Sequence, residues 1–266
     1  MVSEKSSLER CLIALGGNQT VSHDVFQQAM DRLSELGLQL VRLSDCFSTR
    51  PVGQNAGDEF LNAAAVVLTN LPADEVLRCL HQTEEEFGRK RTIHWGPRTL
   101  DLDLILYGQQ VVCRPDLVVP HPAMWYRRFV LQPAAEIAGE LQHPLLGCSV
   151  RELWTQLCSR PLQLEIDWSA RQSASTDLPD SCRLVLLQRV ADRWPDNQVK
   201  ILEAVPETPL LPESCLRIRL IARPQPEDLE YSKQPRHSRS RVIDLIETDP
   251  TRIVQSVEEI LDAMLG

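Results

Sequence analysis

The chain has 266 residues, of which 43% are hydrophobic, 24% charged and 5% aromatic, and its formal net charge is −9. This composition is typical of a globular protein, and the lack of an apolar run long enough to span a bilayer argues against a membrane protein. The negative charge argues against a nucleic-acid partner, because such binding depends largely on Lys and Arg that displace counterions from phosphates. The length predicts one core domain followed by a smaller one.

The eight cysteines are scattered singly, with no C-x-x-C pair of the kind that binds zinc or exchanges disulfides. We therefore expect reduced thiols, most of them buried. The first residues, MVSEKSSLERCLIALGG, combine an acidic and polar start with an apolar stretch too short for a secretory signal. Together these features predict a cytoplasmic protein.

The first ninety residues predict alternating strands and helices. Residues 11–15 (CLIAL) predict a buried strand that runs into a glycine turn. Apolar residues then recur with helical spacing from Val21 to Leu36, and Gly37 stands where such a helix would end. The elements predicted next are a strand at 38–47, a loop rich in Gly, Pro, Asn and Asp at 48–58, a strand at 60–69 and a helix at 72–87.

The segment from Leu100 to Tyr107 alternates leucine with other residues, which predicts a half-buried strand. The leucines would face the core, and Asp101, Asp103, Ile105 and Tyr107 would lie on the other face. Two carboxylates side by side suit Mg²⁺, especially together with substrate phosphates. Taken alone, however, a D-x-D pair is more often a solvated strand edge than a metal site.

Side chains that donate hydrogen bonds, most of them basic, are dense just before this strand, where the sequence places Arg89, Lys90, Arg91, His94, Trp95 and Arg98. Such donors beside paired carboxylates indicate an anionic phosphate between them. This pattern suits phosphoryl transfer, which depends on charge neutralisation and in-line positioning more than on covalent catalysis. The glycine turn at 16–18 lacks the G-x-x-x-x-G-K-[ST] pattern, so the chain is not a P-loop kinase by sequence.

Further elements are predicted along the rest of the chain: strands at 118–121, 182–190 and 216–221, and helices at 127–137, 150–157 and 251–265. Their order in the first part predicts an α+β sandwich, with helices over one mixed or antiparallel sheet. The small and polar stretch 168–181 is typical of a linker. We therefore predict a main domain over residues 1–162, a linker over 163–180 and a small α/β module over 181–266.

Three segments resemble the signature blocks of the 6-hydroxymethyl-7,8-dihydropterin pyrophosphokinase (2-amino-4-hydroxy-6-hydroxymethyldihydropteridine diphosphokinase) family. They are WGPRTLDLDLILYG (Trp95–Gly108), VPHPAMWYRRFVLQP (Val119–Pro133) and FLNAA (Phe60–Ala64). The resemblance covers about the first 160 residues. It implies a ferredoxin-like α/β/α sandwich with a mainly antiparallel sheet. It also implies transfer of pyrophosphate from ATP to 6-hydroxymethyl-7,8-dihydropterin, giving AMP and the pterin diphosphate in folate biosynthesis.

The resemblance also implies a set of site residues. Asp101 and Asp103 would bind two Mg²⁺ ions, with Arg89 and Arg98 completing the catalytic set. The residues implied to bind the nucleotide are Glu84, Arg91, Trp95, His121 and Arg127. Those implied to bind the pterin are Thr49, Val52, Phe60, Asn62 and Phe129, with the two phenylalanines stacking on the ring and the amide reading its edge. The departures from the family pattern are Gly17 for serine, Arg50 for proline, His81 for glutamine and Pro122 for a polar or aromatic residue.

Several of these residues also have an ordinary structural interpretation. Phe60 or Phe129 taken alone is more often a core residue, because buried aromatic side chains are common. An asparagine such as Asn62 also caps turns, and a histidine between prolines, such as His121, also fixes a loop. Trp95 has a simple packing interpretation as well. Only the joint pattern favours a site.

The last hundred residues contain no motif that we can match to a reaction. A basic cluster at 233–241 favours a solvated loop over an anion site. The stretch RVIDLIETDPTRIVQSVEEIL resembles the closing segment of nucleoside and nucleotide kinases, but no phosphate-binding loop accompanies it. We prefer a small module that packs on the first domain or mediates self-association, and we disfavour a fusion with a neighbouring folate enzyme.

Two competing hypotheses remain for the main domain. The first is a kinase for another hydroxymethyl heterocycle, which would keep Asp101 and Asp103 but change the residues around Phe60 and Asn62. The second, from a different class, is a nucleotide-binding regulatory or interaction protein in which the pyrophosphokinase-like domain does not turn over. Loss of a carboxylate would favour the second hypothesis, and both carboxylates are present.

Overall fold

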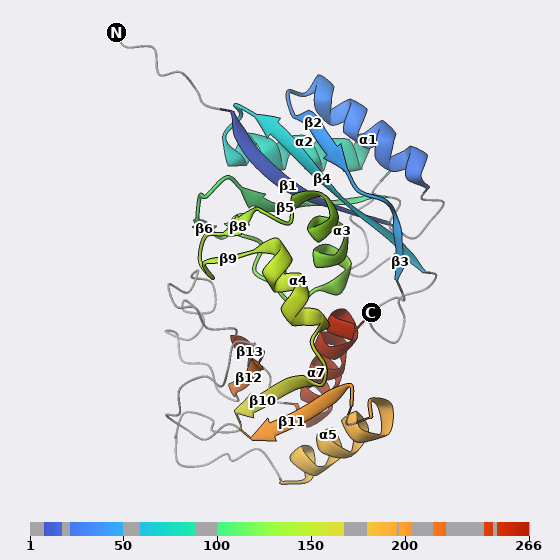
Figure 1. The fold of residues 1–266 in the computed structure, drawn as a ribbon, viewed down its shortest axis with the longest axis vertical. Helices are drawn as coiled ribbons and strands as arrows, with labels where there is room; N and C mark the ends of the chain where they lie inside the picture. Colours follow the sequence, from blue (N-terminus) through green and yellow to red (C-terminus); the bar gives the residue numbers. More distant parts are fainter. Residues whose placement is uncertain are drawn as a thin grey trace. The chain divides into compact units, whose positions relative to one another are not determined.

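The computed structural model describes residues 8–17, 22–49, 59–88, 100–167, 180–195, 197–203, 215–221, 242–246 and 249–265. The chain divides into two compact units (Figure 1). Unit 1 ends at Trp154, and unit 2 runs from Thr155 to Met264. In the described parts of both units, no helix is long and apolar enough to cross a membrane.

Unit 1 is built on a five-stranded antiparallel sheet. Its strands are β1 (Glu9–Gly17), β2 (Gln39–Leu43), β3 (Phe47–Thr49), β4 (Phe60–Thr69) and β5 (Asp101–Tyr107). They lie in the order β2-β4-β1-β5, and β3 pairs with the first residues of β4. Two small hairpins follow along the chain, β6 (Val112–Arg114) with β7 (Leu117–Val119) and β8 (Gln142–His143) with β9 (Cys148–Ser149). Unit 1 is therefore an α+β fold.

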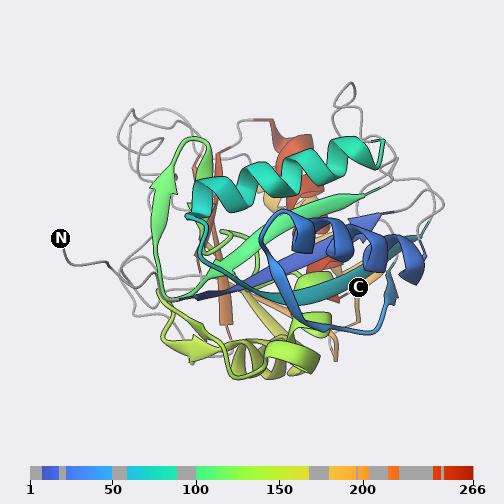
Figure 2. The ribbon, with the colours of Figure 1, turned by 90° about the horizontal axis from the view of Figure 1, so that it is seen from above.

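Helices cover both faces of this sheet. They are α1 (His23–Glu35), α2 (Ala73–Glu86) and α3 (Arg128–Ala138), and a further helix, α4 (Val150–Cys158), crosses the boundary between the units along the chain. Figure 2 shows α1 and α2 lying together over one face, while α3 packs on the opposite face against β4, β1 and β3. The sheet is therefore the middle layer, with α1 and α2 on one face and α3 on the other.

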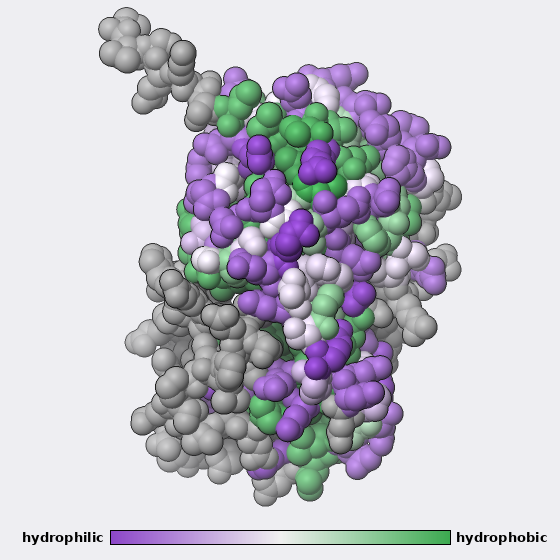
Figure 3. Space-filling view, in the orientation of Figure 1, coloured by the Kyte–Doolittle hydropathy of each residue, from purple (hydrophilic) through white to green (hydrophobic). Residues whose placement is uncertain are grey.

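The face under α1 and α2 holds the main hydrophobic core. Alternate residues of β1, Cys11, Ile13 and Leu15, are buried there with Phe26 of α1 and Leu80 of α2. Each fully buried large apolar side chain contributes about 1.5–3 kcal/mol. Figure 3 shows a mostly hydrophilic visible surface, with an apolar area over the strands of unit 1.

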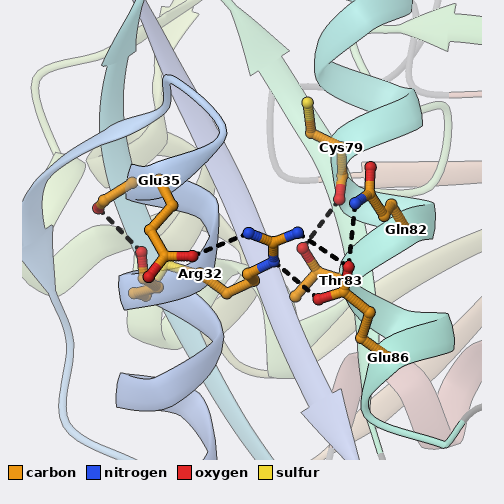
Figure 4. A network of polar contacts seen from close by, with 8 residues as sticks. Arg32, Glu35, Cys79, Gln82, Thr83 and Glu86 are labelled. Carbon is orange, nitrogen blue, oxygen red and sulfur yellow. Dashed lines mark hydrogen bonds and ion pairs between the residues drawn. The ribbon is translucent and has the colours of Figure 1, made fainter.

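A polar bridge joins α1 to α2 at the rim of this core (Figure 4). The Arg32 guanidinium donates from Nε to Glu86 Oε2 at 2.7 Å and from Nη2 to Glu86 Oε1 at 2.9 Å, and it also binds Glu35. Gln82 donates to the same Glu86 carboxylate at 2.9 Å. The hydrogen bonds from Arg32, followed by that from Gln82, lower the pKa of Glu86 to about 2. The bridge orients the two helices that carry the core.

The alternation predicted for β5 holds at the aspartates and fails at Ile105. Leu12 of β1 pairs with Leu106, whereas its neighbour Ile13 pairs with Leu104, so Ile105 is an extra residue in β5. This β-bulge shifts the side-chain alternation by one position. Tyr107 therefore joins the core on the α1 and α2 side, and the prediction that it shares a face with Asp101 is wrong.

Unit 2 contains a four-stranded parallel sheet. Its strands are β10 (Leu162–Asp167), β11 (Val199–Glu203), β12 (Cys215–Ile221) and β13 (Val242–Ile246), in the order β11-β10-β12-β13. Its helices α5 (Asp180–Arg193) and α7 (Pro250–Leu265) lie side by side, because Arg189 and Arg193 of α5 form ion pairs with Glu258 and Asp262 of α7. Unit 2 is an α/β module.

Two predictions for unit 2 differ from its structure. Residues 182–190, predicted as a strand, belong to helix α5, where Leu186 and Val190 are buried four residues apart while Leu184 is exposed. Trp194, buried one residue beyond the helix, continues this spacing. The run of apolar residues concealed this helical period. The predicted boundary places residue 162 in the main domain and residues 163–167 in the linker. These residues form β10, which lies between β11 and β12 inside the second sheet.

The cysteines only partly match the expectation of burial. Of the six that the structure describes with their burial, Cys11 and Cys79 are buried, Cys46 and Cys148 are half-buried, and Cys113 and Cys158 are exposed, and all six are free thiols. Burial, followed by the nearby Glu9, raises the pKa of Cys11 to about 12. Cys11 is therefore an inert core residue.

Candidate functional site

The candidate site lies on the sheet face opposite α1 and α2. At the carboxyl end of β1, Gly16 stands opposite Asn62 of β4 on one side and opposite Asp101 of β5 on the other. Residues directly opposite each other in antiparallel strands project from the same face. Asn62 and Asp101 are therefore placed on one face with only a glycine between them.

The next row along β1 repeats this arrangement with small residues. Ala14 stands opposite Ala64 of β4 and opposite Asp103 of β5. A Cβ atom added at Gly16 would lie 3.4 Å from Asn62 Oδ1, in van der Waals contact with the amide. Gly16 and Ala14, both half-buried, thus form a floor between the amide and the two carboxylates, whereas Ala64 is buried.

Asp101 and Asp103 are half-buried and two residues apart, before the bulge, so both project toward this floor. Their donor set consists of carboxylate oxygens, which hard cations such as Mg²⁺ prefer. No cluster of three or more His, Cys, Asp or Glu side chains suited to a metal occurs among the described residues. Two carboxylates nevertheless fit Mg²⁺, because this ion commonly completes its shell with water and substrate phosphates.

On the β3 and β4 side, the structure brings three of the predicted pterin residues together. Asn62 is 5% exposed, and its Nδ2 donates to Thr49 Oγ1 at 2.8 Å and to the Phe60 carbonyl at 3.4 Å. Thr49 pairs with Phe60 across the two strands. These bonds fix the orientation of the amide, as a group that reads the edge of a flat ligand requires.

Phe129 reaches the same region from the first turn of α3, which packs on β4 and β3. The Arg127 guanidinium lies 5.5 Å from the centroid of the Phe129 ring, within the range of a cation–π contact. The structure thus brings Phe129 and Arg127 to the face that carries Asn62.

His121 is held in one place and one protonation state. Its backbone N–H donates to the Ile105 carbonyl at 2.9 Å, and its Nδ1 accepts the Ala123 N–H at 3.2 Å. Burial, followed by the positive charge of Arg127, lowers the pKa of His121 to about 4, with Asp101 opposing. Because Nδ1 is an acceptor, the neutral ring carries its proton on Nε2, which is then a hydrogen-bond donor.

Glu84, predicted to bind the nucleotide, lies at the end of α2 and is 1% exposed. Its Oε1 accepts the backbone N–H of Leu102 at 2.8 Å. Leu102 is the residue between the two aspartates. The structure therefore places Glu84 against the strand that carries the carboxylates.

Five predicted site residues lie outside the described residues: Arg89, Arg91, Arg98, Trp95 and Val52. Of the departures from the family pattern, Gly17, His81 and Pro122 lie among the described residues, and Arg50 does not. The sequence reasoning missed the floor residues Ala14 and Gly16. The run ALGG at the end of a buried strand was the available signal, since such small residues permit close approach of a ligand.

A family model described as 7,8-dihydro-6-hydroxymethylpterin-pyrophosphokinase (HPPK) matches residues 12–139. A 2-amino-4-hydroxy-6-hydroxymethyldihydropteridine pyrophosphokinase of Pseudomonas aeruginosa is 39% identical over 138 residues, which cover 52% of this chain and 85% of that protein. The protein of the same name from Bacillus subtilis is 38% identical over 131 residues, covering 49% of this chain and 78% of its own length.

Among solved structures, this chain is similar to Plasmodium falciparum HPPK-DHPS crystallised with pteroate, with a TM-score of 0.46 and 11% identity. That similarity covers 80% of this chain and 58% of the other, but it is too low to support an argument about the fold. The match of the family model ends at Gly139, before unit 2 begins.

Proposed function

This chain belongs to the 7,8-dihydro-6-hydroxymethylpterin-pyrophosphokinase family, and on that premise we propose that unit 1, a ferredoxin-like sandwich, catalyses its reaction on the sheet face that carries Asn62, Asp101 and Asp103. The protein is a folate-pathway pyrophosphokinase that uses ATP as co-substrate. The hydroxymethyl oxygen of 6-hydroxymethyl-7,8-dihydropterin attacks the β-phosphorus of ATP. The bond from that phosphorus to the α-phosphate oxygen breaks, and AMP leaves.

The observation that carries this proposal is the row formed by Asn62, Gly16 and Asp101 on three neighbouring strands. Neighbouring strands lie about 4.8 Å apart, so the backbones of Asn62 and Asp101 are separated by about 10 Å. This span accommodates a two-ring heterocycle whose substituent points at a phosphate. Gly16 leaves the path between the two ends open.

The pterin would lie at the β3 and β4 end. Asn62, oriented by Thr49, would read the edge of the ring, and Phe60 and Phe129 would stack on its two faces. The backbone at Val52 would line the same slot, by resemblance to the family. Such a site combines an apolar slot with a few fixed polar groups, which is the usual construction for small heterocycles.

The triphosphate would lie at the β5 end. Asp101 and Asp103 would hold two Mg²⁺ ions, which when bound supply charge neutralisation on the phosphate oxygens. The Nε2–H of His121 would donate to a phosphate oxygen, and Arg127 would add a positive charge beside it. The family pattern assigns Arg89, Arg91 and Arg98 to the phosphates and Trp95 to the nucleotide.

The proposed activity is tested by AMP release from ATP and Mg²⁺ with the full-length chain. Pterin-dependent AMP, with the pterin diphosphate as co-product, would support the proposal. AMP formation with a different hydroxymethyl heterocycle and not with the pterin would favour the rival kinase. Tight ATP binding without AMP for any acceptor would favour the regulatory protein.

We also propose that unit 2 is a separate module that mediates self-association, and that the protein works in the cytoplasm without a nucleic-acid or membrane partner. The unit has its own sheet and its own buried residues, among them Leu164, Ile218 and Val257. Sedimentation analysis of the full-length chain tests the self-association. A monomer at micromolar concentration would contradict it.

A further inference from the structure

The carboxylate of Glu84 contacts the backbone between the two proposed metal ligands. Glu84 Oε1 accepts the N–H of Leu102 at 2.8 Å, and the residues on either side of Leu102 are Asp101 and Asp103. Both partners are buried, since Glu84 is 1% and Leu102 2% exposed. A buried bond to a charged acceptor is about twice as strong as a neutral one.

Glu84 approaches the strand from the side of the helices. Its helix, α2, packs on the core face, where its residues Val76 and Leu80 are fully buried. The side chain of Leu102 belongs to the same core. Since side chains alternate along a strand, Asp101 and Asp103 project to the opposite face. A residue that binds the Leu102 peptide from the core side can therefore position the aspartates without occupying the face to which they project.

The position of β5 in the sheet gives this bond its importance. β5 is the last strand in the order β2-β4-β1-β5, so among the described residues one of its edges has no neighbouring strand. Buried peptide groups at such an edge need partners from elsewhere in the protein. Loss of the acceptor for a buried N–H typically costs about 1–3 kcal/mol, and here that cost falls on the first residues of the metal-binding strand.

We propose that Glu84 is a positioning residue, which fixes the Leu102 peptide and so holds the carboxylates of Asp101 and Asp103 in the spacing that the metal ions require. This inference rests on the proposed function, because it concerns the same metal site. It is an alternative to the expectation that Glu84 contacts the nucleotide, and the substitutions below distinguish the two roles. Residues that support metal ligands in this way typically change metal affinity by about 10- to 100-fold.

Two substitutions distinguish the effect of the length of the Glu84 side chain from the effect of its charge. Glu84→Gln keeps the length of the side chain and an oxygen acceptor but loses the charge. Glu84→Asp keeps the charge but shortens the side chain by one methylene, so that it no longer reaches the Leu102 N–H. A positioning role predicts Mn²⁺ affinity within about threefold of wild type for Glu84→Gln and at least about tenfold weaker for Glu84→Asp. A direct metal or nucleotide contact through charge predicts the reverse order.

The matched control is Thr83→Val. Thr83 precedes Glu84 on α2, is fully buried, and donates from Oγ1 to the Cys79 carbonyl at 2.9 Å, a hydrogen bond within α2. The substitution removes a buried hydrogen bond of α2, so it lowers the melting temperature. We expect Mn²⁺ affinity and AMP formation to stay at wild-type levels. A fall in Mn²⁺ affinity with Thr83→Val would show that general loosening of α2 is sufficient, and would overturn the proposal.

The measurement is Mn²⁺ binding by electron paramagnetic resonance in the full-length chain, with α,β-methylene ATP present so that no turnover occurs. Mn²⁺ affinity lower for Glu84→Asp than for Glu84→Gln supports the proposal, and equal affinities or the opposite order overturn it. AMP formation by the wild-type protein is measured separately. Its absence would count against the proposed function, whereas the order of the two variants in Mn²⁺ binding decides the role of Glu84.

Discussion

The sheets of the two units carry charge in opposite ways. In unit 2, Glu165 of β10 and Arg217 of β12 stand in register on neighbouring strands, and Arg217 Nε donates to Glu165 Oε2 at 2.6 Å. In unit 1, β5 carries two carboxylates of the same sign on one face, two residues apart. A buried pair of opposite charges neutralises itself, whereas two adjacent carboxylates attract a cation. The first arrangement supports a fold, and the second provides a site.

The largest expected effect is on the stability of unit 2. In Arg217→Met, the Glu165 carboxylate, 2% exposed, keeps its burial and loses its counter-charge, which typically costs about 3–5 kcal/mol. Hydrogen exchange should accelerate in β10 and β12 and stay unchanged in β1 and β4. The double variant Glu165→Leu/Arg217→Met should recover most of the loss. Unchanged protection in β10 would show that this pair does not stabilise the sheet.

Asp103→Ala is the corresponding test in unit 1. We expect a native fold and a fall in AMP formation of at least about a hundredfold, because a metal clamp contributes several kcal/mol to the transition state. Asp116→Ala is the matched control, since Asp116 is an exposed aspartate in the turn between β6 and β7. A fully active Asp103→Ala would rule out the proposed metal site.

Gly16 is the next test, because it separates the two ends of the proposed site. An alanine Cβ there would be 3.4 Å from Asn62 Oδ1, an ordinary van der Waals contact, whereas the methyl groups of valine would extend over the floor. We expect a small effect for Gly16→Ala and a loss of kcat/KM for the pterin of about 10- to 100-fold for Gly16→Val, equivalent to 1–3 kcal/mol of overpacking.

Gly147→Ala is the control for this series. Gly147 has a φ of +64° and an added Cβ there meets nothing within 4 Å, so the substitution strains the backbone away from the site. Its kcat/KM should match that of wild type. An active Gly16→Val with an unchanged KM for the pterin would mean that the substrate does not cross this floor.

The sequence predicted unit 1 better than unit 2 for a physical reason. The segments that became α1 and α2 carry a clear helix period, because one side of each is buried in the core, and β1 and β4 are apolar runs bounded by turn residues. The helix at 180–193 presents apolar residues on its exposed side as well, so its helical period is concealed. In β10 the alternation LQLEID is present, but the predicted boundary at residue 162 cuts across it, because the partner strands of β10 lie far along the chain.

The site shows the same limit. Its residue types and their order could be recognised in the sequence, and five of the nine predicted residues that are described lie on strands paired in one sheet: Thr49, Phe60, Asn62, Asp101 and Asp103. The position of Asn62 and Asp101 on either side of Gly16 depends on the register of three strands. The bond from Leu102 to Glu84 likewise depends on how α2 docks. Neither relation is written in any single segment.

The smallest expected effect concerns acid sensitivity, which should differ between the units. His143 accepts the N–H groups of Leu145 and Leu146 through Nδ1, and burial lowers its pKa to about 4 from an ordinary value of 6.5. Below pH 6.5 the unfolded chain binds a proton at His143, whereas the native chain does not bind it until about pH 4. The free energy of unfolding is therefore undiminished by this group above pH 6.5 and falls as the pH drops toward 4.

His143→Asn keeps an acceptor at this position and removes the titrating group. Between pH 7 and pH 5, His143 should cost the wild-type protein roughly 1–2 kcal/mol of unfolding free energy that the variant does not lose. Urea unfolding at both pH values measures the difference, and His23→Asn, at an exposed position, is the control. Hydrogen exchange should place the change in unit 1, since the described residues of unit 2 include no histidine. An equal loss in the variant would mean that other groups cause the acid sensitivity.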